Sequence, residues 1–127
     1  MCEILLSIHP QHVNNILCGT KKYEYRKIAC KRHVDKIVIY STTPIKKVVG
    51  EAEVLEVLEK DKEELWNETK DSSGISKQFF LQYYEGRKKA VAYKLGKVVK
   101  YSEPKELSDY GIQAAPQSFA YIVEEQH

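Results

Sequence analysis

The spacing of the β-type segments along the chain is the feature that most constrains its fold. Apolar and β-branched residues cluster or alternate in stretches at residues 2–8, 23–28, 34–42, 46–60, 90–101 and 118–124. Short helical patterns separate only some of these stretches, whereas a doubly wound parallel sheet needs a regular helical crossover between successive strands. The spacing therefore predicts an α+β fold: a small, partly open mixed β-barrel of about six strands, with about three short helices packed around it.

The three helical patterns have recognisable ends. The first begins at Pro10, which is tolerated in the first turn of a helix, and ends before Gly19. The second follows Asp61, which opens an aspartate version of a capping box. The third follows a candidate cap at Ser76 and stops at Gly86.

Two further local features bear on packing. Gly50 interrupts the fourth β-type stretch and predicts a bulge or a bend there. In the third helical pattern, aromatic residues pair at i, i+4 spacing, and we assign them to core and helix packing. These residues are Phe79, Phe80, Tyr83 and Tyr84.

The chain is expected to be one domain over residues 1–127, because no repeat, linker or low-complexity segment divides it. No apolar run approaches the roughly 18 residues that span a bilayer, so a membrane protein is not expected. The amino-terminal residues lack the basic region and cleavage site of a secretory signal. Three cysteines without a CxxC pair indicate neither a disulfide framework nor a zinc site, and we expect a cytoplasmic location. The sequence leaves the oligomeric state open.

Charge is segregated along the chain although the net charge is only +2. Residues 1–50 carry nine Lys or Arg against three Asp or Glu, and residues 51–85 carry four against ten. Residues 86–101 contain six Lys or Arg and no acidic residue. If the two basic segments lie side by side, they form a positive face suited to a polyanion. Dispersed lysines that only keep the protein soluble are the alternative.

The sequence CGTKKYEYRK, residues 18–27, gathers its charges around two tyrosines directly after a glycine. In a strand, the period of two places Glu24 and Arg26 on one face and both tyrosines on the other, with Lys21 at the preceding turn. One interpretation is a solvated, salt-bridging face worth under about 1 kcal/mol. The other is a ligand site, in which Glu24 accepts from a base amino group or acts as a general base. Lys21 and Arg26 would then hold phosphate or an oxyanion.

The segment GTKKYEYRK resembles the Gly-x-Lys-x-x-Glu-x-Arg signature of the ASCH family, a branch of the PUA-like superfamily. Gly19, Lys21, Glu24 and Arg26 occupy its positions. The flanking blocks agree in order, with ILLSIHPQHVNNILCG before it, then VIYSTTPIKKVVGEAEV, GISKQFFLQYYEGRKKAVAYKLG and APQSFAYI. The resemblance covers nearly the whole chain.

This resemblance implies a PUA-like β-barrel with a cleft for RNA that the signature residues line. Members of the family differ in activity: some are RNA-binding modules, a bacterial branch hydrolyses the acetyl amide of N4-acetylcytidine, and another member cleaves RNA. In the amidohydrolase branch the signature lysine, here Lys21, is the proposed nucleophile or base. That branch has a threonine where this chain has Glu24, and a nearby carboxylate would favour the charged form of the lysine.

Further candidate ligands lie outside the signature. Ser41 stands at the end of a β-type stretch and could bond a phosphate or a base edge, although a plain turn explains it equally well. Gln117 and Ser118 precede the last stretch, and Gln117 could read a base through its amide. Tyr23 or Tyr25 could stack on an unpaired base, with core packing as the alternative for one of the two.

We therefore predict a protein that binds RNA, single-stranded or carrying a modified base, through the cleft of Lys21, Glu24 and Arg26. Arg87 and Lys88 would extend its electrostatic footprint. The alternative is a small hydrolase of a modified nucleoside or of RNA, with Lys21 and Glu24 as its acid–base pair. A scaffold that binds a protein through the acidic segment 51–71 is a third reading. No cofactor and no metal are expected, because the sequence has no phosphate-binding loop and no metal-ligand spacing.

Overall fold

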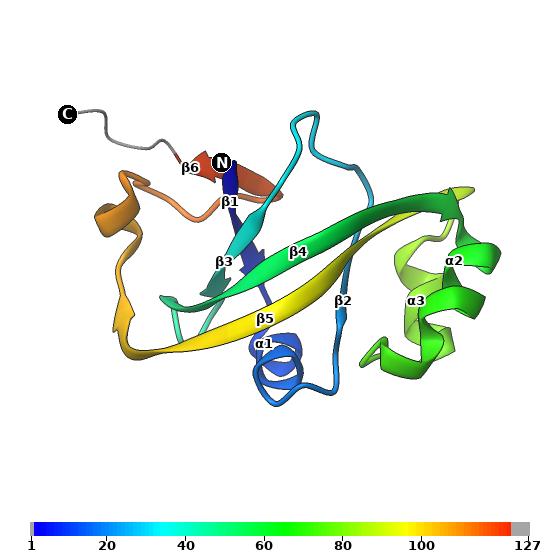
Figure 1. Ribbon diagram of the computed structural model, residues 1–127, viewed down its shortest axis with the longest axis horizontal. Helices are drawn as coiled ribbons and strands as arrows, with labels where there is room; N and C mark the ends of the chain where they lie inside the picture. The colour runs from blue at the N-terminus through cyan, green and yellow to red at the C-terminus, as the bar shows by residue number, and fades with distance from the viewer. Residues whose placement is uncertain (1, 123–127) are drawn as a thin grey trace.

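The computed structural model describes residues 2–122, and its strands form one six-stranded sheet (Figure 1). The order across the sheet is β2-β5-β4-β3-β1-β6. Only β1 and β3 run parallel, and the other neighbours are antiparallel. The predicted α+β class with a mixed sheet is thus confirmed. The strands are β1 (Glu3–Ile8), β2 (Tyr23–Arg26), β3 (Lys36–Ser41), β4 (Lys47–Asp61), β5 (Lys89–Lys105) and β6 (Phe119–Ile122).

The sheet is open, so the predicted barrel is not confirmed. Within residues 2–122, β2 and β6 stand at opposite ends of the strand order and no ladder joins them. The last predicted stretch ran to residue 124, and its final two residues lie outside the described range. One side chain links the two sides of the opening: Arg26 of β2 donates to the backbone oxygen of Ser7 in β1 at 2.9 Å. The curved sheet therefore approaches closure through a guanidinium group instead of a ladder.

The long strands β4 and β5 form a twisted ribbon that runs the length of the molecule (Figure 1). Their register shifts between Val48 and Gly50, which confirms the irregularity predicted at this glycine. A Cβ at Gly50 would lie 2.6 Å from the backbone oxygen of Val99 on β5. Only glycine permits this close approach of the two backbones.

Three α-helices accompany the sheet, as predicted: α1 (Pro10–Leu17), α2 (Lys62–Thr69) and α3 (Lys77–Tyr83). Short 3₁₀ segments are η1 (Lys70–Ser72) and η2 (Leu107–Tyr110). The Ser76 hydroxyl accepts from the N–H of Phe79, so the predicted cap of α3 is confirmed. The cap predicted at Asp61 is wrong: its side chain makes no capping bond and instead pairs with Lys89 across β4 and β5.

Three apolar clusters hold the elements together, and two of them lie under the α-helices. The larger lies under α1 and joins β1 and β3 to the middle of β5, with Ile4, Leu6 and Ile39 at its centre. The second lies under α2 and α3, around Phe80 and Tyr84, which are fully buried. Strand β2 stands between α1 and α3 because its pairing with β5 connects it to both clusters. This leaves a pocket where the two clusters meet.

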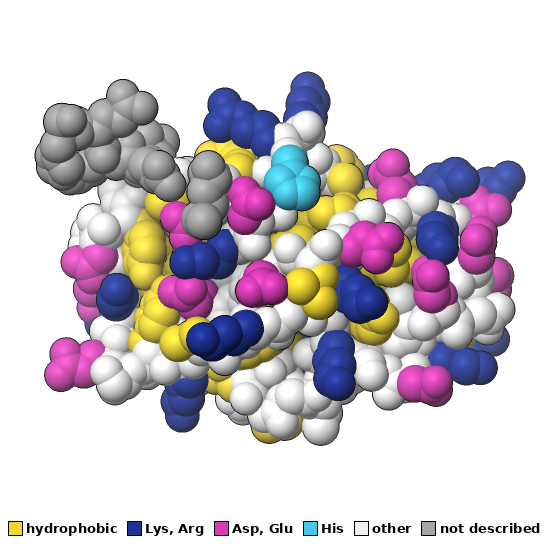
Figure 2. Space-filling view, viewed as in Figure 1, with side chains coloured by type: hydrophobic (Ala, Val, Ile, Leu, Met, Phe, Trp, Pro, Cys, Tyr) yellow, Lys and Arg dark blue, Asp and Glu magenta, His cyan; other side chains and the backbone are white. Residues whose placement is uncertain are grey.

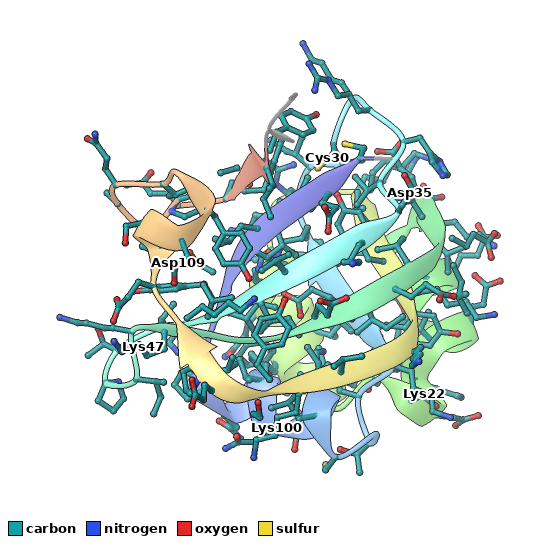
Figure 3. All side chains as sticks on the ribbon, turned by 60° about the vertical axis from the view of Figure 1, so that its left-hand side comes forward. Lys22, Cys30, Asp35, Lys47, Lys100 and Asp109 are labelled. Atoms are coloured by element: carbon teal, nitrogen blue, oxygen red, sulfur yellow. The ribbon has the colours of Figure 1, made fainter. Side chains whose placement is uncertain are left out.

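The basic segments do not form a uniform positive face in the view that Figure 2 gives, where Lys and Arg alternate with Asp and Glu. Sheet pairing explains the mixture. The first basic segment meets the second where Tyr23 pairs with Lys94, but the acidic strand β4 lies on the other side of β5 and opposes Glu56 to Lys94. Figure 3 likewise shows Lys22, Lys47 and Lys100 at separate places on the outside of the molecule.

Candidate functional site

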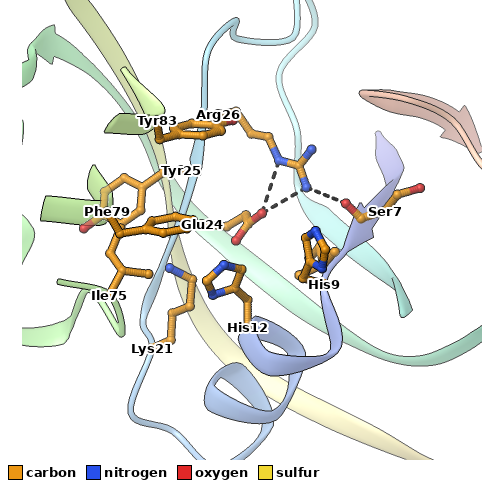
Figure 4. Close-up of a pocket in the computed structure, with 11 residues that line it drawn as sticks. Ser7, His9, His12, Lys21, Glu24, Tyr25, Arg26, Ile75, Phe79 and Tyr83 are labelled. Carbon is orange, nitrogen blue, oxygen red and sulfur yellow. Dashed lines mark hydrogen bonds and ion pairs between the residues drawn. The ribbon is translucent and has the colours of Figure 1, made fainter. Parts of the chain in front are cut away.

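A pocket of about 300 Å³ opens where β1, α1, β2 and α3 meet (Figure 4). Its walls are mostly apolar, and its polar groups converge from different elements: Ser7 from β1, His12 from α1, and Lys21, Glu24 and Arg26 from β2 and the turn before it. Pockets of this size and character typically hold small ligands.

Lys21 is held by the turn between α1 and β2. Gly19 has a φ of 89°, which lets the chain reverse, and the N–H of Lys21 donates to the backbone oxygen of Asn15 at 3.0 Å. The side chain is only 2% exposed. Its Nζ donates to the backbone oxygen of Ser73 at 2.7 Å and lies 4.7 Å from the centre of the Tyr25 ring.

Gly74 permits the loop after η1 to close over this lysine. A Cβ at Gly74 would lie 2.6 Å from Cβ and 2.8 Å from Cγ of Lys21, and the glycine has a φ of 69°. Both the contact and the backbone conformation exclude an ordinary side chain. The segment at residues 73–74 therefore forms a lid over the Lys21 alkyl chain and leaves its amine at the pocket.

Burial lowers the pKa of the Lys21 amine to about 8. The Glu24 carboxylate opposes this shift and the Arg26 guanidinium adds to it, but the loss of water is the largest cause. Glu24 favours the charged form of this lysine, as expected, but desolvation outweighs the carboxylate and the pKa falls. Roughly a tenth of the amine is neutral at pH 7.

Glu24, which is buried, and Arg26, which is partly buried, form an ion pair on one face of β2. The Nε and one Nη atom of Arg26 donate to the same oxygen of Glu24, Oε2, at 3.2 and 2.9 Å. Arg26 also donates to the backbone oxygens of Ser7 and Ser118. Figure 4 shows the Glu24 carboxylate facing Arg26 on one side and His12 and Lys21 on the other. Within the described residues Oε1 accepts no hydrogen bond, so it is the oxygen that a ligand can reach.

His12 projects from α1 into the same pocket. Burial and the nearby Lys21 amine lower the pKa of its imidazole, so the ring is neutral around pH 7. Its Nδ1 is buried and has no hydrogen-bond partner among residues 2–122. The ring stands edge-on to Phe79, with 5.5 Å between centroids. A buried nitrogen without a partner in a polar pocket is a candidate contact for a ligand.

The remaining lining residues are Ile8, His9, Tyr25, Ile75, Phe79 and Tyr83. Phe79 is 45% exposed, so its assignment to the core is wrong, whereas Phe80 beside it is fully buried. Neighbouring residues on a helix point about 100° apart, so both rings could not face the core. That angle is the one sequence signal that could have separated them. No feature of the sequence could have predicted that His12 and Ser73 belong to the site.

The other predicted site residues lie at or beyond the edge of the pocket. Ser118 contributes its backbone oxygen to Arg26, with Gln117 exposed beside it. Arg87 is exposed and donates to the backbone oxygen of Lys27, just past the end of β2. The remaining three do not line the pocket: Tyr23 packs against the second apolar cluster, Ser41 is buried at the end of β3, and Lys88 is exposed before β5.

No cluster of three or more His, Cys, Asp or Glu side chains within residues 2–122 has the arrangement of a metal site. None of the helices in that range combines the length and the apolar character that crossing a membrane requires.

Comparison with known proteins connects this geometry to a family. The sequence model of the ASCH domain matches residues 6–110. The chain belongs to the ASCH domain family. The resemblance carried by Gly19, Lys21, Glu24 and Arg26 is thereby confirmed, and the convergence of the last three at one pocket explains their spacing in this ASCH domain.

Three relatives illustrate the range of similarity. An "ASCH domain-containing ribonuclease" of Zymomonas mobilis is 32% identical over 94 residues, 73% of this chain and 64% of that protein. The "ATP synthase subunit alpha" of Ureaplasma parvum is 32% identical over 120 residues, 94% of this chain. The chain spans only 15% of the ATP synthase subunit, and less than two thirds of the length of each of these two relatives. The crystal structure of ASCH from Zymomonas mobilis superposes with a TM-score of 0.88 at 27% identity, covering 96% of this chain and 88% of that one.

Proposed function

We propose that this ASCH domain binds RNA and holds one unstacked nucleotide in the pocket of Lys21, Glu24 and Arg26. The observation that carries the proposal is the convergence of an amine, an ion-paired carboxylate and a neutral imidazole inside aromatic walls. Single-stranded RNA is recognised by such combinations, because aromatic rings stack on the base and polar groups read its edge.

The contacts assign a role to each polar side chain. A charged Lys21 amine has three donors and spends one on Ser73, so two remain for phosphate or a base carbonyl. Glu24 offers Oε1 to the amino group of a base. Arg26 spends four hydrogen bonds on the protein, so its main role is to orient Glu24.

The test is fluorescence anisotropy of a labelled single-stranded RNA over a series of salt concentrations. Lys21→Met should weaken binding by about tenfold or more and reduce the salt slope by about one. Lys22→Met is the matched control, because Lys22 is adjacent but exposed and does not line the pocket. If wild type and Lys21→Met bind the RNA with equal affinity and equal salt slopes, the proposal that RNA binds in this pocket is wrong.

A second candidate function is hydrolysis, and the lowered pKa of Lys21 favours it. A neutral Nζ can accept the proton of an RNA 2′-hydroxyl. The freed oxygen then attacks the adjacent phosphorus, and the 5′-oxygen leaves with a proton from water. The same neutral amine could serve as nucleophile or base at the acetyl carbonyl of N4-acetylcytidine. The ribonuclease name of the Zymomonas relative supports the first of these reactions.

Turnover separates this candidate from binding alone. Purified protein is incubated with end-labelled RNA and, separately, with N4-acetylcytidine, between pH 6 and pH 9.5. Activity should rise with pH and level off above about pH 8, as the lysine loses its proton. Lys21→Met should abolish it. Absence of product from both substrates at high protein concentration would leave binding as the function.

A further inference from the structure

A second hollow adjoins the pocket and has no part in the roles assigned above. It measures about 790 Å³ and lies between α1, the turn at Thr20 and the segment from η1 to the start of α3. It shares four lining residues with the pocket: His9, His12, Ile75 and Phe79. The two hollows are therefore continuous, and a ligand held in the pocket can extend into the second, which we call the groove.

Phe79 stands on the boundary between pocket and groove. The Ser76 cap fixes its backbone in the first turn of α3, with 3.1 Å from the N–H of Phe79 to the hydroxyl oxygen. Phe79 is 45% exposed, and its ring forms a T-shaped pair with the His12 ring. An exposed phenyl group of this size contributes little to the core. Beside a ligand pocket it offers a stacking surface.

The polar groups of the groove differ from those of the pocket. Its own lining includes Gln11, Thr20, Lys70 and Asp71, so one cation is matched by one anion. Such a balanced set suits the donors and acceptors of a base or sugar better than a dense phosphate charge. The aromatic boundary and the neutral polar floor together favour a nucleoside unit.

We propose that the groove holds the nucleotide next to the one in the pocket, with Phe79 stacking on its base. The substrate class of this site is then RNA of at least two nucleotides, and not a free nucleoside. This inference rests on the proposed binding of RNA in the pocket. It assigns the groove, the boundary ring and the preferred ligand length.

The experiment compares 5′-labelled oligouridylates and oligoadenylates of one, two and three nucleotides in an anisotropy titration. The expected result is a gain in affinity of about tenfold from one nucleotide to two, because a second stacked base adds its own contact. A smaller gain follows from two to three. The ratio of dinucleotide to mononucleotide affinity is the quantity that reports on the groove.

Gln11→Trp is designed to fill the groove from the exposed face of α1, and Asn14→Trp places the same side chain on that helix away from it. The first should reduce the ratio to near one, and the second should leave it at the wild-type value. Phe79→Ala should also lower the ratio, and Phe79→Tyr should restore it. Because each variant is judged by its ratio of dinucleotide to mononucleotide affinity, an equal loss of affinity for both ligands would leave the ratio unchanged.

The possible failures are distinguishable. If mononucleotides and dinucleotides bind equally well to the wild type, the groove is not a subsite, while RNA binding in the pocket stands. If Gln11→Trp keeps the wild-type ratio, the added affinity arises elsewhere and the assignment of the groove is overturned. If no oligonucleotide of any length binds, the proposed function itself fails.

Discussion

Two lysines of this protein sit beside carboxylates, yet their environments move the pKa of the amine in opposite directions. Lys36, on the outer face of β3, bonds Glu51 at 2.9 Å and Glu3 at 3.3 Å, and the bond to Glu51 raises its pKa. Lys21, in the pocket, has Glu24 nearby but donates to a backbone oxygen, and burial lowers its pKa to about 8. A neighbouring acid does not by itself decide the charge of a lysine. Water access and the direct bonding partner do.

The same contrast extends to the two regions around these lysines. The outer face of the sheet carries partly exposed ion pairs that solvent screens. The pocket carries the largely buried pair of Glu24 and Arg26, whose geometry also depends on two hydrogen bonds from Arg26 to the backbone oxygens of Ser7 and Ser118. Charges on the outer face can therefore be changed with little effect, whereas those of the pocket are coupled to the fold.

The largest expected effect is the loss of Arg26. Arg26→Met leaves the Glu24 carboxylate buried without its partner and breaks the link from β2 to Ser7. We expect a loss of about 3 to 5 kcal/mol in the free energy of unfolding, measured by urea denaturation. Lys36→Met should cost under about 1 kcal/mol. Similar losses from the two substitutions would contradict the distinction between buried and outer charges.

The next effect is a dependence of stability on pH that belongs to Lys21. Its pKa is about 8 in the folded protein and about 10.4 in the unfolded chain. Between these values the unfolded state binds more protons, so stability rises with pH over this window. The gain, up to about 3 kcal/mol, should appear in wild type relative to Lys21→Met. The raised pKa of Lys36 has the opposite effect on stability. Lys36 stabilises the folded state at lower pH, and this stabilisation is lost as the pH rises above the usual pKa of lysine.

A parallel pH series of urea denaturations from pH 7 to pH 10 checks this prediction. The free energy of unfolding of wild type minus that of Lys21→Met should increase as the pH rises. A difference that stays constant across the series would place the Lys21 amine in a water-exposed setting, and the comparison with Lys36 would fail.

A smaller effect distinguishes two glycines that both have positive φ. Gly74 has a φ of 69° and contacts Lys21, whereas Gly86 has a φ of 79° and open space around it. Substitution by alanine strains the backbone at both positions, but only Gly74→Ala also drives a Cβ into Lys21. We expect Gly74→Ala to be about 1 to 3 kcal/mol less stable than Gly86→Ala in thermal or urea unfolding. Equal losses would show that the lid over Lys21 adjusts freely.

The smallest effect concerns the helix that carries the pocket wall. Ser76→Ala removes the hydroxyl that accepts from the N–H of Phe79 and should lower the free energy of unfolding by about 1 kcal/mol. Ser76→Asn, which can keep the cap, should retain most of it. A loss from Ser76→Asn as large as that from Ser76→Ala would mean that the cap bond does not stabilise α3.

Much of the fold could be predicted because local patterns report local structure. The β-type stretches, the cap at Ser76 and the irregularity at Gly50 follow from periodicity, hydroxyl chemistry and close backbone approach. Whether the sheet closes into a barrel could not be predicted, because closure depends on whether β2 and β6 meet, and no local pattern encodes that distance. The cap predicted at Asp61 failed because a cross-strand partner, Lys89, competes for its carboxylate.

What the sequence by itself determined about the site is the grouping of Glu24 and Arg26, because a strand repeats every two residues. Only the tertiary structure decided the chemistry of Lys21. Its amine donates to the backbone oxygen of Ser73, 52 residues further along the chain, and Gly74 lies against its alkyl chain. Desolvation depends on how closely the folded chain excludes water, and that exclusion arises when distant segments pack together.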